Sequence, residues 1–213
     1  MPETTTTPAR AWEEMVRGNE RFIAGKPRHP RQDVERRGEL IGTQAPHVVL
    51  FGCSDSRLAA EIIFDKGLGD LFVIRNAGQV ISESVIGSIE YAVAILGVPL
   101  IVVLGHDECG AVSAAIDSQR NDAPAIPPHI RHLIAPITAA VAKIQKGLPE
   151  GESPDPSVVG REHLRATINT MVANSELISE AIAAGTLAIV GANYRLLEGM
   201  AVPDVVIGDI SAM

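Results

Sequence analysis

The sequence predicts an α/β fold in a single domain, with a mostly parallel central sheet covered by helices on both faces. Short apolar runs alternate with longer segments of helical spacing along most of the chain. The apolar runs are continuous, as in strands that are buried on both faces of a parallel sheet. A chain of 213 residues with 46% hydrophobic content is long enough for one core. We expect one domain over residues 1–213, with a helical arm at about 8–42 and a core at about 45–213.

The first half of the chain predicts three strands. The opening helix follows Thr7, a capping residue, has Pro8 in its first turn, and ends before Gly25. A charged connector then leads to Gly42. Ser82 is a suitable cap for the longest helix of this half. Strands are predicted at 47–52, 71–75 and 100–105, with helices at 58–67 and 82–97 between them.

The second half of the chain is more helical. Two stretches rich in Pro, Asp and Gly, 119–128 and 147–156, are predicted to be loops. The elements expected around them are a helix at 129–145 that is interrupted or kinked at Pro136, a long helix at 157–184, a strand at 186–194 and an antiparallel last strand at 202–209.

Composition excludes several classes of protein. A net charge of −8 disfavours a general binder of nucleic acid or anionic membranes, because both need clustered positive charge. No apolar window reaches the ~18 residues of a membrane span. The opening "MPETTTTPARAW" lacks the basic and apolar regions of a secretory signal. We therefore expect a cytoplasmic protein with reduced cysteines.

Both cysteines lie just after predicted strands. Cys53 opens "CSDSR", which also supplies Asp55 and Arg57, and "HDEC" carries His106 and Cys109. The carboxyl ends of parallel strands share one edge of a sheet, and sites form there. If the strands at 48–52 and 100–105 are neighbours, the two thiols and the imidazole meet.

Two thiolates and one imidazole are suitable ligands for zinc. Structural zinc sites use four protein ligands, whereas catalytic sites use three and leave one position open. None of the other histidines (His29, His47, His129, His132, His163) has a matching partner in the sequence. Asp55, held by Arg57, can orient a zinc-bound hydroxide, or it can become a fourth ligand that closes the site.

Simpler interpretations exist for each residue alone. A cysteine after an apolar strand is most often just buried, Asp55 and Arg57 can form a structural ion pair, and Asp107 can cap a helix that begins near Cys109. A dithiol redox pair is disfavoured because no Cys-x-x-Cys is present. The combination of all these residues at two strand ends favours a metal site.

Cys-x-Asp-x-Arg together with His-x-x-Cys resembles the β-class carbonic anhydrases, over most of the chain. The resemblance implies zinc at Cys53, His106 and Cys109, with Asp55 and Arg57 as catalytic residues. It implies that zinc-bound hydroxide attacks carbon dioxide to give bicarbonate. It also implies a homodimer or a dimer of dimers, in which the N-terminal helix packs on the partner subunit.

The resemblance also assigns residues to a narrow substrate pocket, some of them contributed across the dimer interface. These are Gln44, Phe72, Ala77, Tyr91 and Gly110. Leu50 stands where bicarbonate-regulated members carry tryptophan, although Arg75 and Tyr194 match other parts of that regulatory site. We therefore do not expect this regulation.

Two alternative functions stay open on the same scaffold. One is hydrolysis of carbonyl sulfide or carbon disulfide, because pocket width and access decide between such similar substrates. The other is a non-catalytic zinc-binding protein, which the presence of Asp55, Arg57 and Gln44 disfavours.

Overall fold

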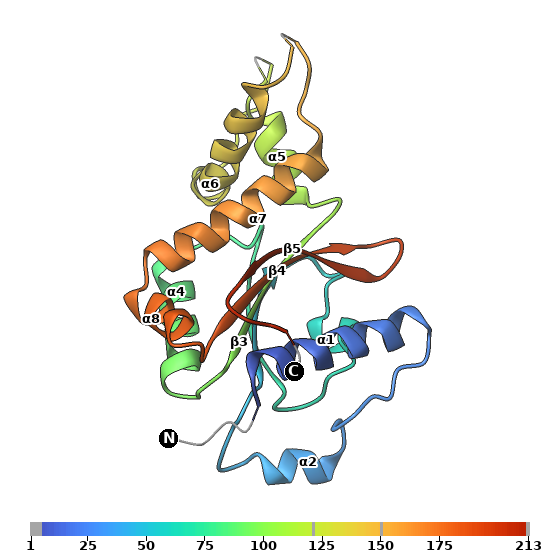
Figure 1. Cartoon of the computed structure of the whole chain (residues 1–213). Helices are drawn as coiled ribbons and strands as arrows, with labels where there is room; N and C mark the ends of the chain where they lie inside the picture. Colours follow the sequence, from blue (N-terminus) through green and yellow to red (C-terminus); the bar gives the residue numbers. More distant parts are fainter. Residues whose placement is uncertain (1–5, 121, 150, 212–213) are drawn as a thin grey trace.

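The fold is organised around one five-stranded sheet with the order β2-β1-β3-β4-β5 (Figure 1). The structure is a computed structural model that describes residues 6–120, 122–149 and 151–211. The strands are β1 (Val48–Cys53), β2 (Leu71–Asn76), β3 (Leu100–His106), β4 (Ala188–Arg195) and β5 (Met200–Ile207). The first four are parallel and β5 is antiparallel to β4. The predicted fold class is confirmed, including the antiparallel last strand.

Helices cover both faces of this sheet and the edge where its parallel strands end. The helices are α1 (Pro8–Ile23), α2 (Val34–Glu39), α3 (Ala60–Ile63), α4 (Glu83–Ala94), α5 (Gly110–Asp117), α6 (Pro128–Gln145), α7 (Pro156–Ala173) and α8 (Glu176–Ala183). Side chains of α1 and α3 form one core with the sheet, and those of α4, α7 and α8 form a second core on the opposite face. Helices α5 and α6 pack with α7 around a third apolar cluster that contains both cysteines.

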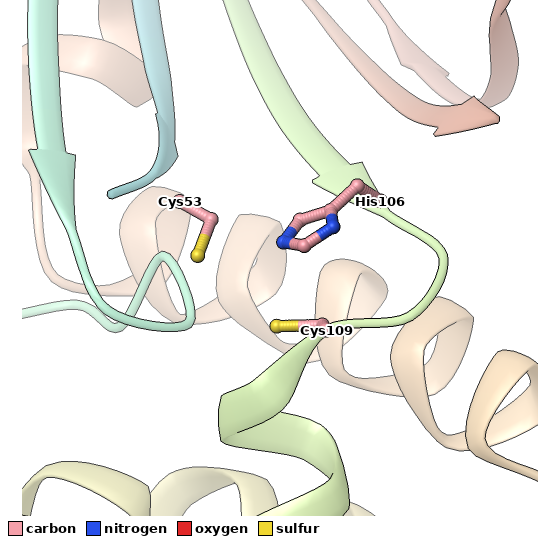
Figure 2. Close-up of side chains that lie close together, drawn as sticks. All are labelled: Cys53, His106 and Cys109. Carbon is pink, nitrogen blue, oxygen red and sulfur yellow. The ribbon is translucent and has the colours of Figure 1, made fainter. Parts of the chain in front are cut away.

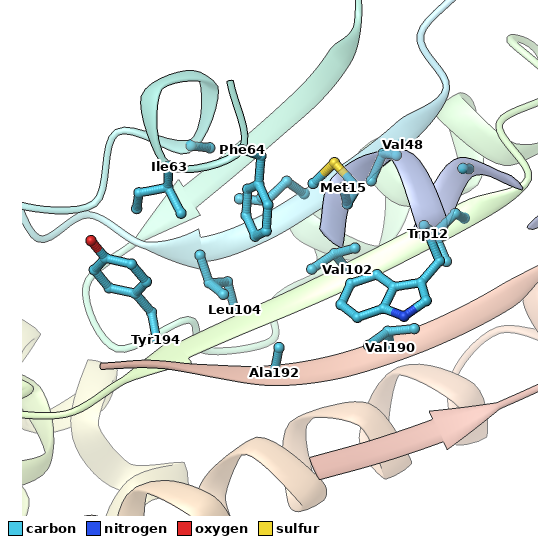
Figure 3. Close-up of a cluster of buried hydrophobic side chains, with 14 of the residues drawn as sticks. Trp12, Met15, Val48, Ile63, Phe64, Val102, Leu104, Val190, Ala192 and Tyr194 are labelled. Carbon is cyan, nitrogen blue, oxygen red and sulfur yellow. The ribbon is translucent and has the colours of Figure 1, made fainter. Parts of the chain in front are cut away.

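Helix α1 packs on the sheet of its own chain. Thr7 caps it by accepting a hydrogen bond from the Arg10 N–H, as predicted. Trp12 and Met15 are buried against β1, β3 and β4 (Figure 3). The Asn19 side chain is buried and bonds the Ile63 carbonyl, the Gly199 carbonyl and the Ala201 N–H. One face of α1 is thus committed within the chain, and its predicted contact with a partner subunit stays a prediction.

The predicted long helix at 157–184 is wrong, because the chain forms two helices there. Helix α7 ends at Ala173, and α8 begins after its N-cap, Ser175. The Ser175 hydroxyl accepts from the Ile178 N–H and donates to Glu90 of α4 at 2.6 Å. The cap bond to the Ile178 N–H takes the place of a backbone bond in a continuous helix. The bond to Glu90 fixes this break against α4.

Two other predicted helices differ from the structure. The helix expected at 58–67 is reduced to α3, because Asp65 adopts a left-handed φ of +45° and ends it. The Asp65 carboxylate accepts from the backbone N–H groups of Arg28 and His29, which holds that conformation. Helix α6 runs through Pro136 without a break, so an interruption there is wrong, and the alternative of a kink stays a prediction.

Within the described residues, no helix is long and apolar enough to cross a membrane. This agrees with the apolar windows of the sequence, all of which are too short for a span.

We expect Gly18→Ala to destabilise the fold by about 1–3 kcal/mol, the usual cost of overpacking. An added Cβ at Gly18 would collide with the backbone carbonyl of Phe64, which cannot turn away as a flexible side chain can. Urea denaturation of the variant measures the effect. Gly160→Ala in α7 is the matched control: its Cβ would meet nothing within 4 Å, so it should be neutral or stabilising. An undiminished stability of Gly18→Ala would contradict the packing of α1 on α3.

Candidate metal centre

The two cysteines and His106 meet at the carboxyl ends of β1 and β3. These strands are parallel neighbours, with Gly52 level with Leu104, so the chain leaves both at nearly the same height. Cys109 lies three residues after His106, the last residue of β3, and is the N-cap of α5. The three ligand atoms lie within 4.8 Å of one another, and all three residues are buried. Figure 2 shows both sulfur atoms and the imidazole turned toward a common space.

The imidazole of His106 is oriented to bind a metal through Nε2. Its Nδ1 lies 2.7 Å from the carbonyl oxygen of Asp107, which can only accept a hydrogen bond. Nδ1 therefore carries the proton and Nε2 keeps its lone pair. Nε2 is buried and has no hydrogen-bond partner among the described residues. A buried lone pair that faces two sulfur atoms fits a cation, and second bonds of this kind to a carbonyl are typical of metal-binding histidines.

The thiols of Cys53 and Cys109 shift each other's pKa in opposite directions. A hydrogen bond from Cys109 lowers the pKa of Cys53, and the hydrogen bond from the Gly78 N–H lowers it further. The Cys53 sulfur, together with burial, raises the pKa of Cys109. Two bare thiolates this close would repel each other. A divalent cation would hold both of them, which is the chemistry of a zinc-type site.

Asp55 is held beside the cluster by Arg57. Nε and Nη2 of Arg57 donate to the two carboxylate oxygens at 2.9 and 2.7 Å, and the Arg57 backbone N–H adds a third bond at 2.9 Å. These hydrogen bonds keep the pKa of Asp55 well below its usual range, so the group is a carboxylate at neutral pH. Both carboxylate oxygens of Asp55 accept hydrogen bonds from Arg57, which fixes the orientation of the carboxylate. Its predicted alternative position as a fourth ligand stays a prediction.

Arg57 also joins the two loops that carry the ligands. Its Nη2 donates to the Glu108 carbonyl at 3.1 Å, one residue before Cys109. Asp107 does not cap α5: its carboxylate accepts from the Leu196 N–H at 3.0 Å, and Cys109 occupies the cap position. The suggestion that Asp107 caps the helix is therefore wrong. Asp107 instead ties the ligand loop to the turn between β4 and β5.

Sequence reasoning missed the contacts that fix Cys53 from the side of β2. Arg75 donates to the carbonyls of Cys53 and Asp55 at 2.9 and 2.6 Å. The Gly78 N–H donates to Cys53 Sγ at 3.3 Å. The parallel register pairs Cys53 with Asn76, so the residues that follow β2 necessarily lie beside it. The signal for these contacts in the sequence is the run "RNAG", which begins with the last residue of the predicted strand.

The predicted substrate residues fall into two groups in the single chain. Ala77 and Gly110 are exposed and adjoin Gly78 and Cys109, so they lie at the cluster. The second group lies away from the cluster and consists of Gln44, Phe72 and Tyr91. Phe72 is level with Val49, about 13 Å along the strand from Cys53 at about 3.3 Å per residue.

The second group forms its own surface near the edge strand β2. The rings of Phe72 and Tyr91 are 6.2 Å apart between centroids, and 46% of Tyr91 is exposed. Gln44 and Tyr91 line a hollow of about 550 Å³ that contains none of the cluster residues. Within one chain, these residues therefore cannot contact a molecule bound at the cluster.

Comparison with known proteins identifies the family. A family model described as carbonic anhydrase matches residues 48–201. Carbonic anhydrase 2 of Mycobacterium tuberculosis is 49% identical over 205 residues, which cover 96% of this chain and 97% of the relative. The chain belongs to the carbonic anhydrase family. The carbonic anhydrase of Mycolicibacterium smegmatis is 45% identical over 196 residues, or 91% of this chain and 92% of that one.

Solved structures identify the β class of carbonic anhydrase. A tetrameric β-carbonic anhydrase of the fungus Sordaria macrospora is 28% identical with a TM-score of 0.69, covering 78% of this chain and 84% of that chain. The β-carbonic anhydrase CafA of Aspergillus fumigatus has a TM-score of 0.71 at 24% identity, with 95% of this chain and 92% of that chain covered, and shows the same fold. The resemblance noted from the two motifs is confirmed.

Removing a ligand of this β-carbonic anhydrase should remove its metal. We expect His106→Ala and Cys53→Ser to bind Zn²⁺ or Co²⁺ more than about 100-fold more weakly, beyond the usual cost of changing an outer-shell residue. Metal content after dialysis against a chelator, measured by mass spectrometry, checks this. His132→Ala, an exposed histidine of α6, is the control and should keep the parent metal content. Equal retention by His106→Ala and the control would contradict the ligand assignment.

Proposed function

We propose that this β-carbonic anhydrase binds one zinc ion through Cys53, His106 and Cys109 and catalyses the reversible hydration of carbon dioxide to bicarbonate and a proton. The observation that carries the proposal is a buried set of three donors with a carboxylate already oriented beside it. A closed structural site would need a fourth protein ligand, and an oriented acid would have no purpose there.

The donor set favours zinc over harder cations. Thiolate and imidazole ligands suit zinc, whereas magnesium and calcium prefer oxygen. Zinc bound here would supply a Lewis acid that lowers the pKa of a water molecule and so provides the nucleophile at neutral pH. The two thiolates formally cancel the charge of the ion, which weakens that effect, so the chain's own residues have to contribute.

Asp55 makes that contribution as a hydrogen-bond acceptor. Because Arg57 keeps its pKa low, Asp55 stays ionised and accepts the hydrogen of the attacking oxygen, which turns a lone pair of that oxygen toward the carbon of carbon dioxide. Arg57 prevents Asp55 from rotating, since two parallel N–H···O bonds define the carboxylate plane. Ala77 and Gly110, both small, leave room beside the cluster for a small linear substrate.

A second copy of the chain completes the pocket in this proposal. The Sordaria macrospora protein is described as tetrameric, and β2 of this chain is an edge strand with partly exposed side chains. Gln44, Phe72 and Tyr91, which lie away from their own cluster, would line the cluster of the partner. A dimer or a dimer of dimers would provide this arrangement.

The role of Asp55 is tested by stopped-flow hydration of carbon dioxide on protein of known metal content. We expect Asp55→Ala to keep its zinc and to lose about 100-fold or more in kcat, the usual range for a positioned acid–base group. Asp122→Ala is a matched control, because Asp122 pairs with Arg120 in a similar two-bond contact far along the chain. A parent rate for Asp55→Ala would rule out the proposed role, and an inactive, zinc-loaded parent would rule out the proposed activity.

The contribution of the second copy is tested by mixing subunits. Gln44→Ala and Asp55→Ala should each be nearly inactive alone. Co-expressed, they should regain roughly a quarter of the parent activity, because half of the random dimers contain one site with both residues intact. Co-expression of Asp55→Ala with Arg57→Ala is the control and should restore nothing, since both changes fall in the same half of the site. Absence of recovery with Gln44→Ala would contradict a pocket built from two chains.

A further inference from the structure

The turn next to Cys53 is fixed by side-chain hydrogen bonds. It spans residues 76–80, between β2 and α4. The Asn76 side chain closes it in both directions, donating to the Val80 carbonyl at 2.7 Å and accepting from the Val80 N–H at 2.8 Å. Within it, the Gly78 N–H points at Cys53 Sγ. The turn therefore presents one backbone donor to a proposed metal ligand.

The position of Gly78 is fixed by conformation and by space. Its φ of +79° lies in the left-handed region, where side chains are unfavourable. A Cβ there would lie 2.9 Å from both the Ala111 Cβ and the Ile137 Cδ1. The turn is packed tightly beneath α5 and α6, and only glycine fits.

The carbonyl of the same residue is bound by His163 of α7. Nε2 of His163 lies 2.7 Å from the Gly78 oxygen, across 85 residues of sequence. Because a carbonyl only accepts, Nε2 carries the proton. The imidazole is buried, with 1% of the residue exposed, and burial lowers its pKa, so it is neutral. Nδ1 is left without a hydrogen-bond partner among the described residues.

This arrangement is costly if His163 serves only to fill space. A buried nitrogen without a partner is unfavourable, and an apolar residue would pack in α7 without that penalty. The cost is understandable if the Nε2–H donor is needed. His163 holds the carbonyl side of Gly78 while Cys53 Sγ accepts from its N–H side, so both peptide planes of Gly78 are fixed.

We propose that His163 is a positioning residue of the metal centre, which acts through Gly78 to aim a backbone N–H at Cys53 Sγ. The inference rests on the proposed function, because it assumes that Cys53 binds the metal as a thiolate. A hydrogen bond to a ligating thiolate stabilises its negative charge and tunes its donation to the metal. Loss of the His163 bond would let the turn relax and would weaken that contact, without touching any ligand.

The test compares three variants of the full-length protein. His163→Leu removes the donor and keeps an apolar side chain of similar reach. His163→Gln keeps an N–H donor near the position of Nε2. Thr167→Val is the matched control, because Thr167 is buried one turn further along α7 and its hydroxyl has no partner among the described residues.

Two measurements report on the metal rather than on turnover. One is the rate at which a chelator removes zinc from the loaded protein. The other is the energy of the sulfur-to-metal charge-transfer band in the Co²⁺-substituted protein. We expect about 10-fold or faster metal loss and a shifted band for His163→Leu, the range found for outer-shell changes. His163→Gln and Thr167→Val should stay close to the parent in both.

The inference is overturned if His163→Leu folds and matches the parent in both measurements. It is also overturned if His163→Gln loses metal as fast as His163→Leu, or if Thr167→Val does, because the effect would then be one of packing. Should His163→Leu fail to fold, the result for His163→Gln decides: parent-like values support the inference and a shifted band refutes it. A parent protein that binds no zinc would overturn the proposed function together with this inference. A parent that binds zinc and is matched by His163→Leu would overturn this inference alone.

Discussion

The parallel pairing of β1 with β3 is the constraint on which the metal centre depends. The register sets Gly52 level with Leu104, so Cys53 and His106 leave the two strands within about one residue of the same height. Side chains alternate between the two faces of a strand, and a slip of one residue would send each to the opposite face. The apolar side chains of β1 and β3 are buried in the cores on both faces and resist such a slip. Hydrophobic packing of the whole sheet thereby determines the spacing of three ligand atoms.

Hydrogen bonds from side chains to the backbone then fix the loops that follow β1 and β3. Arg57 binds the Glu108 carbonyl, Arg75 binds two carbonyls of the Cys53 loop, and Asp107 binds the Leu196 N–H. Charged side chains are used here to fix loops, because charge-assisted bonds are short and directional. The side chains proposed as ligands are consequently held in position by the backbone around them.

The residues proposed for chemistry and those proposed for substrate binding lie apart in the single chain. The three donors and Asp55 lie where the parallel strands end, whereas Gln44 and Tyr91 line a hollow elsewhere on the same chain. Such a division is meaningful only if two copies combine, and the exposed ring of Tyr91 beside the edge strand β2 is consistent with that need. Association and substrate binding would then be linked, because neither subunit alone would provide a complete pocket.

The sequence by itself determined the class of fold, the caps Thr7 and Ser82, and the three residues that could hold a metal ion. These features are encoded locally, by apolar runs, by capping residues, and by motifs at two strand ends. Only the tertiary structure decided the break between α7 and α8 and the role of His163. Ser175 meets Glu90, and His163 meets Gly78, each across 85 residues. No local pattern specifies such contacts, because they arise only after the helices have packed on the sheet.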